Sequence, residues 1–143
     1  METSVRKFFE RYESCFNQSL GGDVDMDEVA ALYASEFIAA SPAGVMAGKN
    51  DDQLKQLMAQ GYARYRATGT KGMRIRNVRL SSIDDHHCVA HVAWTATYAR
   101  KDQSDVAIDF DVHYFVQKLD GEPKVFGWVS GDEQALLRTH GII

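Results

Sequence analysis

Four ionisable side chains at alternate positions of two segments are the first candidates for chemistry: Asp109, Asp111 and His113 in one segment, and His91 in the other. A histidine beside a carboxylate in a partly dry site can act as a general acid or base, because its surroundings tune its pKa toward neutral pH. The expected catalytic pair is Asp111 and His113. The alternative is that these residues form ordinary polar pairs on a sheet face that is open to water.

Histidines and carboxylates together can also hold a transition metal. His87 and His91, however, are four residues apart on one predicted strand, roughly 13 Å, which is too far to share an ion. His86 falls in a polar turn next to them. We therefore expect no metal site and no other cofactor.

Two alternating segments, 87–98 and 106–119, position these side chains. If they form a hairpin, Trp94 faces Phe110 and His91 faces His113. The even positions then make a nearly continuous apolar face, and the odd positions make a half-polar face. In one reading, the apolar face packs on the helices and the odd face meets water. In the other, the odd face lines a cavity and the even face meets a second subunit. The residues alone favour the first reading.

The remaining pattern predicts one α+β domain over residues 1–143. Three N-terminal helices pack on a strongly bent antiparallel sheet of about four long strands plus a short N-terminal hairpin, and a short helix ends the chain. The predicted elements are helices over 5–20, from Asp25 and from Asn50, strands over 36–40, 45–47, 73–83, 87–98, 106–119 and 124–130, and a helix after Ser130.

Composition narrows the class of protein. The 143 residues are 45% hydrophobic and 25% charged with a net charge of -4, which is ordinary globular usage and argues against binding to nucleic acid or to an anionic membrane. The opening Met1-Glu2-Thr3-Ser4 lacks the basic and apolar regions of a secretory signal. We expect a cytoplasmic protein in which Cys15 and Cys88 are reduced, buried thiols.

The order of elements resembles the nuclear transport factor 2-like superfamily, in particular its SnoaL-like and ketosteroid isomerase-like branch. The most specific parts are the strand 109–119 followed by Asp120-Gly121, and the aromatic strand Val125-Phe126-Gly127-Trp128. The resemblance implies a cystatin-like, cone-shaped fold and one mostly apolar pocket per subunit, between the first and third helices and the concave sheet face. It also implies a homodimer through a sheet face.

The family resemblance also assigns residues. In ketosteroid isomerases an acid of the oxyanion hole occupies the position of Phe115 here, and the tyrosine of that hole corresponds to Tyr12. The missing acid argues against steroid isomerisation. The resemblance places the odd positions in the pocket, so on balance we expect the odd face to line it. Aromatic residues at helical spacing add further candidates. The expected ligand-binding residues are Tyr12, Phe16, Phe37, Tyr62, His91, Phe115 and Trp128.

The expected function is binding of a small organic molecule. Two alternatives stay open: an acid/base enzyme of the isomerase, cyclase, dehydratase or hydrolase type that uses the His/Asp pair, and a non-catalytic assembly module. Fold analogy does not by itself choose among them.

Overall fold

A single six-stranded sheet, in the order β2-β1-β6-β5-β4-β3, supports the whole molecule. The computed structural model describes residues 1–100 and 103–143. The strands are β1 (Tyr33–Ser41), β2 (Gly44–Lys49), β3 (Thr70–Ser82), β4 (His87–Arg100), β5 (Gln103–Gln117) and β6 (Lys124–Ser130). The helices are α1 (Glu2–Leu20), α2 (Met26–Ala30), α3 (Asp52–Ala67) and α4 (Glu133–Thr139).

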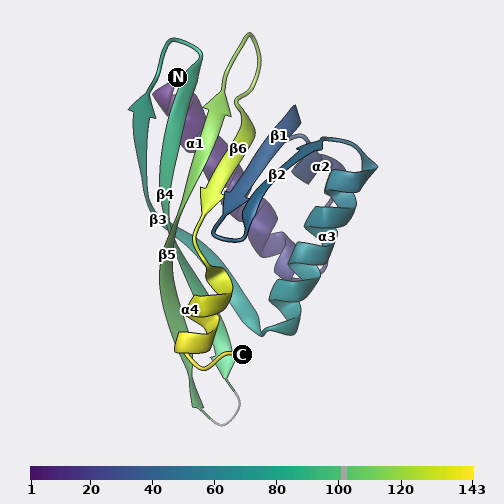
Figure 1. Cartoon of the computed structure of the whole chain (residues 1–143), viewed down its shortest axis with the longest axis vertical. Coiled ribbons are helices and arrows are strands. Elements are labelled where there is room, and N and C mark those ends of the chain that lie inside the picture. The colour runs from purple at the N-terminus through teal and green to yellow at the C-terminus, as the bar shows by residue number, and fades with distance from the viewer. Residues whose placement is uncertain (101–102) are drawn as a thin grey trace.

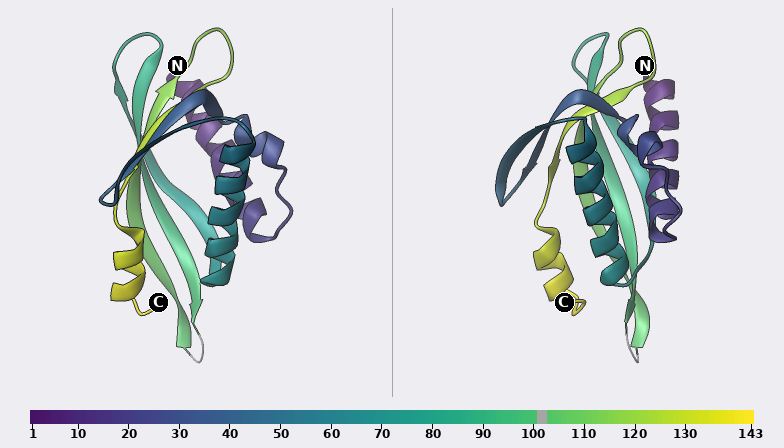
Figure 2. Two further views of the ribbon diagram at one scale, coloured as in Figure 1. Left: turned by 45° about the vertical axis from the view of Figure 1, so that its right-hand side comes forward. Right: turned by 90° about the vertical axis from the view of Figure 1, so that its right-hand side faces the viewer.

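The helices enclose one side of the strongly twisted sheet. In Figure 1, α1 passes behind the sheet, α3 stands beside it, and α4 lies in front of its lower half. In the right-hand view of Figure 2, α3 lies between α1 and α4. The helix α1 can pack in this way because Val5, Phe8 and Phe9 form one apolar stripe and are almost completely buried.

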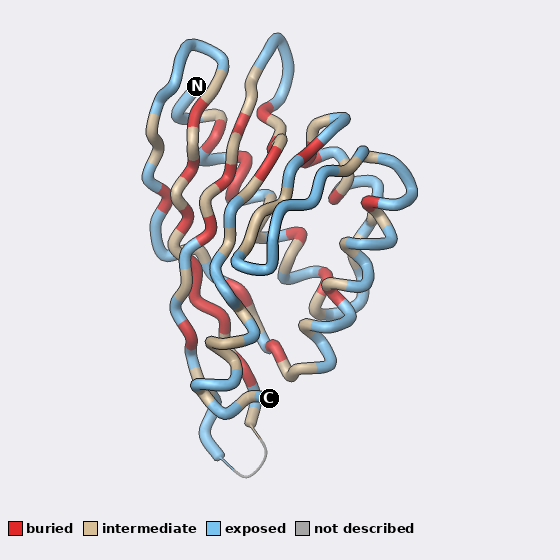
Figure 3. The backbone as a smooth tube through the Cα atoms, viewed as in Figure 1, coloured by how far each residue is buried: buried red, intermediate tan, exposed pale blue. Residues whose placement is uncertain are grey.

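The hairpin of β4 and β5 has the predicted register. His91 faces His113, Trp94 faces Phe110 and Tyr98 faces Val106. Residues 101 and 102, in the predicted connection of this hairpin, lie outside the described residues. The even positions of both strands are mostly buried and belong to the core, which the alternating colours along the tube in Figure 3 make visible. The predicted α+β architecture is thus confirmed.

The N-terminal hairpin joins the main sheet by a parallel pairing between β1 and β6, whereas the sheet was predicted to be antiparallel. Three local predictions also shift. The strand predicted to start at residue 36 begins three residues earlier, at Tyr33. The N-cap of α3 is Asp51, whose carboxylate accepts from the backbone N–H of Gln53. The predicted cap, Asn50, instead donates to two backbone carbonyls that lead into β1.

Both cysteines, Cys15 and Cys88, are buried free thiols. Burial raises the pKa of each thiol, so neither is activated as a thiolate nucleophile. Among the described residues, no helix is both long and apolar enough to span a bilayer.

Candidate functional site

A cavity of about 160 Å³ lies between α1, α3 and the even face of the sheet. The helices α1 and α3 provide one wall, β4 and β5 provide the facing wall, and residues around the end of β6 and the start of α4 complete it. Its walls are mainly aromatic. The aromatic lining residues are Tyr12, Phe16, Tyr33, Tyr62, Tyr65, Trp94, Phe110, Tyr114 and Trp128.

Buried hydroxyl groups give one side of this aromatic cavity a polar character. The hydroxyls of Tyr12 and Tyr33 are 2.7 Å apart, and the indole N–H of Trp94 donates to the hydroxyl of Tyr114 at 3.2 Å. The ring of Tyr12 contacts the ring of Tyr114 edge-on, with centroids 5.3 Å apart. Tyr12 therefore lies between two hydrogen-bonded groups that face the same cavity.

Burial controls the acidity of these phenols. It raises the pKa of Tyr12, and hydrogen bonds with Tyr33 and Tyr114 partly oppose that rise. Burial likewise raises the pKa values of Tyr33 and Tyr114 well above the ordinary value. All three side chains are thus neutral near pH 7, and each carries a proton that it can donate.

A carboxylate also lines this cavity. Glu133, the first residue of α4, accepts a hydrogen bond of 2.6 Å from the hydroxyl of Tyr65 on α3. Burial, followed by the charge of Glu133, raises the pKa of Tyr65 well above its usual range. The bond joins two helices that are 68 residues apart in sequence, and it places the only acidic side chain among the lining residues next to a phenol.

Four of the residues predicted to bind ligand meet at this cavity: Tyr12, Phe16, Tyr62 and Trp128. Phe37 lies behind Trp128. The two rings stack with centroids 5.5 Å apart and planes 10° from parallel, and the ring of Phe37 borders a separate groove between β2 and α3. Phe37 therefore supports the cavity wall.

The odd positions of β4 and β5 lie on the opposite side of the sheet, which we call the outer face. The expectation that they line the cavity is wrong. The apolar even face packs against the apolar sides of the helices and lines the cavity instead. His91, Asp111, His113 and Phe115 are on this outer face, half-buried or exposed. A catalytic role for Asp111 and His113 stays an untested prediction, and the cavity is not its location.

The outer face nevertheless contains a connected polar network. The two Nδ1 atoms of His91 and His113 are 2.7 Å apart, and Nε2 of His91 is 2.9 Å from Oγ of Ser81. Nearby, Thr95 donates to the carboxylate of Asp109 at 2.6 Å. Within residues 1–100 and 103–143, no group of three or more His, Cys, Asp and Glu side chains is arranged around a common metal position.

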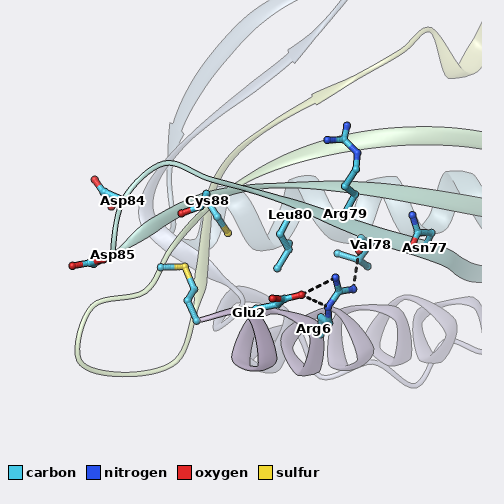
Figure 4. A pocket seen from close by; sticks show the side chains of 11 residues that line it. Glu2, Arg6, Asn77, Val78, Arg79, Leu80, Asp84, Asp85 and Cys88 are labelled. Carbon is cyan, nitrogen blue, oxygen red and sulfur yellow. Dashed lines mark hydrogen bonds and ion pairs between the residues drawn. The ribbon is translucent and has the colours of Figure 1, made fainter.

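A larger hollow, of about 690 Å³, is open to solvent between the start of α1 and the β3–β4 end of the sheet. Figure 4 shows that Arg6 is already engaged there: it donates to the backbone carbonyl of Val78 at 2.7 Å and pairs with Glu2 at 3.2 Å. Arg79 points away from α1 in the same view. Because its charged groups are paired or turned outward, this hollow is a weaker candidate than the aromatic cavity.

Several cavity residues were absent from the predicted set. Trp94 and Tyr114 occupy even positions of the paired strands, so the sequence signal for them was the apolar face itself. Tyr33 lies three residues before the predicted strand 36–40, and Tyr65 lies on the helix predicted from Asn50, where its spacing indicates only an apolar side. Glu133 falls in the helix predicted after Ser130, and its distance in sequence from Tyr65 gives no indication of their contact.

Comparison with known proteins agrees with this architecture. A family model described as NTF2-like protein (DUF6841) matches residues 2–133. No curated protein gives a significant match. The solved structures described below are less than 25% identical to the chain, so they show its fold alone.

Three of those structures illustrate the range. An NTF2-like protein with a cystatin-like fold from Novosphingobium aromaticivorans has a TM-score of 0.70 at 9% identity, covering 99% of this chain and 88% of its own. An NTF-2 like protein of unknown function from Shewanella oneidensis MR-1 has a TM-score of 0.65 at 14% identity, with coverages of 92% and 100%. A ketosteroid isomerase-like protein from Erwinia carotovora atroseptica has a TM-score of 0.63 at 13% identity, with coverages of 90% and 93%. The match over residues 2–133, together with the curved sheet and its covering helices, shows that the chain belongs to the NTF2-like family DUF6841.

Proposed function

We propose that this chain binds a small organic molecule in the aromatic cavity. The observation that carries the proposal is the pair of buried hydroxyls of Tyr12 and Tyr33, 2.7 Å apart, in an otherwise aromatic wall. Cavities that recognise organic ligands combine mostly apolar walls with a few convergent polar groups. The cavity has both properties.

The size of the cavity limits the ligand. Its volume of about 160 Å³ compares with the ~150 Å³ of an apolar cavity that takes up benzene. A molecule with one ring, or an aliphatic one of similar size, fits this space. A four-ring steroid does not.

The hydroxyls favour a ligand that carries an oxygen acceptor. A phenol donates one hydrogen bond and accepts two. Tyr12 can accept from Tyr33 and Tyr114, which leaves its own proton for a carbonyl or similar oxygen of the ligand. A single-ring ketone or enol is therefore the preferred ligand class.

A second candidate function is acid/base catalysis in the same cavity, and the position of Glu133 favours it. A carboxylate can remove a proton next to a carbonyl while a hydrogen-bond donor stabilises the oxygen of the resulting enolate. Glu133 would be the base and Tyr12 the donor. The ketosteroid isomerase-like neighbour adds support at the level of the fold.

Binding can be tested with cyclohexanone, acetophenone and a four-ring steroid ketone as probes, by thermal shift and calorimetric titration. We expect the single-ring ketones to raise Tm and the steroid ketone to have no effect. Tyr12→Phe should weaken binding by about 5–10-fold, because one hydrogen bond contributes roughly 1 kcal/mol. The matched control is Tyr98→Phe, a buried tyrosine that does not line the cavity.

Two results would contradict the binding proposal: no single-ring probe raises Tm, or the two tyrosine variants weaken binding equally. Catalysis has a separate test, the exchange of α-hydrogens of cyclohexanone for deuterium, followed by NMR. Glu133→Gln should abolish exchange while leaving probe binding within about twofold. If the unaltered chain binds cyclohexanone but does not accelerate the exchange, the ligand-binding proposal stands and this reaction is excluded.

A further inference from the structure

His91 and His113 hold two imidazole nitrogens close together in the middle of the outer face. The residues are direct partners on β4 and β5, their ring centroids are 4.9 Å apart, and their Nδ1 atoms are separated by 2.7 Å. Each of these strands has a hydrogen-bonded neighbour on both sides in the sheet. The backbone therefore fixes the spacing of the two rings.

We propose that this histidine pair is a chelating site for a divalent transition-metal ion that prefers ligands at right angles, namely Cu²⁺ or Ni²⁺. Imidazole nitrogens bind such ions at about 2.0–2.1 Å, so two of them at 90° lie roughly 2.9 Å apart. Two nitrogens at a tetrahedral angle lie roughly 3.4 Å apart. The observed 2.7 Å is close to the first arrangement, whereas Zn²⁺ would require the rings to separate.

Ser81 of β3 gives the pair an outer partner. Its Oγ is 2.9 Å from Nε2 of His91. When Nε2–H donates to that hydroxyl, the Nδ1 lone pair of His91 accepts the Nδ1–H of His113. An ion that binds both nitrogens takes the place of this proton, which moves to Nε2 of His113. Metal-binding histidines usually have such a partner, which fixes both the tautomer and the ring orientation. Ser81 is thus a positioning residue.

The neighbouring residues determine how tightly the histidine pair binds an ion. Arg79 faces His91 on β3, and Asp111 precedes His113 by two residues on the same face, so charges of both signs flank the pair. Because no third His, Cys, Asp or Glu of the described chain completes the set, water fills the other positions of the ion. We therefore expect binding in the micromolar range, in the order Cu²⁺ above Ni²⁺ and Zn²⁺.

The test is calorimetric titration of the chain with Cu²⁺ in MES buffer, which does not compete for the ion, with electron paramagnetic resonance of the bound ion. We expect one Cu²⁺ per chain with two coupled imidazole nitrogens. His91→Ala and His113→Ala should each weaken binding by at least about tenfold, and Ser81→Ala should weaken it to a smaller extent. Circular dichroism shows whether each variant is folded, and His113→Gln replaces any variant that is not.

The matched control is His87→Ala, on the same strand, whose ring instead contacts the carboxylate of Asp84 at 2.8 Å. This variant should bind Cu²⁺ as the unaltered chain does. The proposal is overturned if His91→Ala and His113→Ala bind Cu²⁺ as tightly as the unaltered chain. It is also overturned if His87→Ala loses binding equally, or if Zn²⁺ binds more tightly than Cu²⁺.

Discussion

Every tyrosine in the chain has a pKa above its ordinary value, and burial is the largest cause in each case. A phenol near pH 7 is neutral in both the folded and the unfolded chain. Above pH 10 the unfolded chain loses these protons, while the folded chain retains them. The contribution to stability is therefore complete below about pH 10 and is lost as the pH rises further.

This behaviour predicts a steep alkaline transition. Tyr33, Tyr65 and Tyr114, whose pKa values lie well above the ordinary value, should each lower the free energy of unfolding by about 1.4 kcal/mol per pH unit above pH 10. The absorbance of tyrosinate should appear together with loss of the near-ultraviolet circular dichroism, in one cooperative step. Tyrosinate forming gradually near pH 10 in a protein that stays folded would show that the phenols are not buried in solution.

Gly48 gives a second prediction at the scale of single residues. A Cβ atom added there would lie 2.7 Å from the Phe37 ring, which is itself stacked on Trp128. Because that ring cannot move freely, Gly48→Ala should destabilise the fold by about 1–3 kcal/mol in urea unfolding. Gly121→Ala is the control, since its Cβ would have open space. Equal stability of the two variants would show that the Phe37 ring can move aside, which would contradict this prediction.

Some residue positions could be predicted from the sequence and others could not, depending on whether a local pattern determines them. The pairing of His91 with His113 followed from strand alternation alone, and the structure confirms it. The cavity position of Tyr33 could not follow, because a short apolar run reads equally well as the end of a helix or the start of a strand. Glu133 meets Tyr65 only through the tertiary arrangement of α3 and α4.

At the scale of elements, α1 protects the open edge of the sheet. The edge strand β3 would otherwise expose backbone hydrogen-bonding groups. Asn17 donates to the carbonyl of Met73 at 2.7 Å and accepts from its N–H at 2.8 Å, and Glu13 accepts from the N–H of Ile75. The polar side of α1 thus pairs with β3.

This contact predicts that Asn17→Ala destabilises the fold by about 1–3 kcal/mol, because it leaves both backbone groups of Met73 without a side-chain partner. Urea unfolding measures the change. Glu10→Ala, an exposed position of the same helix, should stay within about 0.5 kcal/mol of the unaltered chain. If Asn17→Ala changed stability no more than Glu10→Ala, the prediction would be wrong. Water would then replace the hydrogen bonds of Asn17 to Met73 at little cost in free energy.

At the scale of the whole molecule, the decisive choice is which face of the sheet meets the helices. The residues alone favoured the even face, and the structure agrees, because the stripe of α1 needs an apolar partner. The family resemblance pointed the other way. Hydrophobic patterning was the better guide here, since it reports the burial of these particular side chains, whereas an alignment at low identity can shift a strand by one residue.

The outer face also carries an apolar patch, and we propose that a second copy of the chain covers it. Val45, Ile38 and Val129 are 75%, 52% and 39% exposed, on neighbouring strands β2, β1 and β6. Their register places them on one face, since Ala40 pairs with both Val45 and Val129. Exposed apolar residues grouped in this way mark interaction surfaces.

The resulting homodimer should sediment at twice the 16.0 kDa chain mass at micromolar concentration. The double variant Ile38→Lys, Val129→Lys should sediment as the single chain, because two cations facing their symmetry mates cannot be desolvated without partners. Ile83→Lys, which changes an apolar residue that is 60% exposed at the β3–β4 end, should stay dimeric. A 16.0 kDa species for the unaltered chain would refute the dimer, and dissociation of the Ile83→Lys variant would move the interface away from this patch.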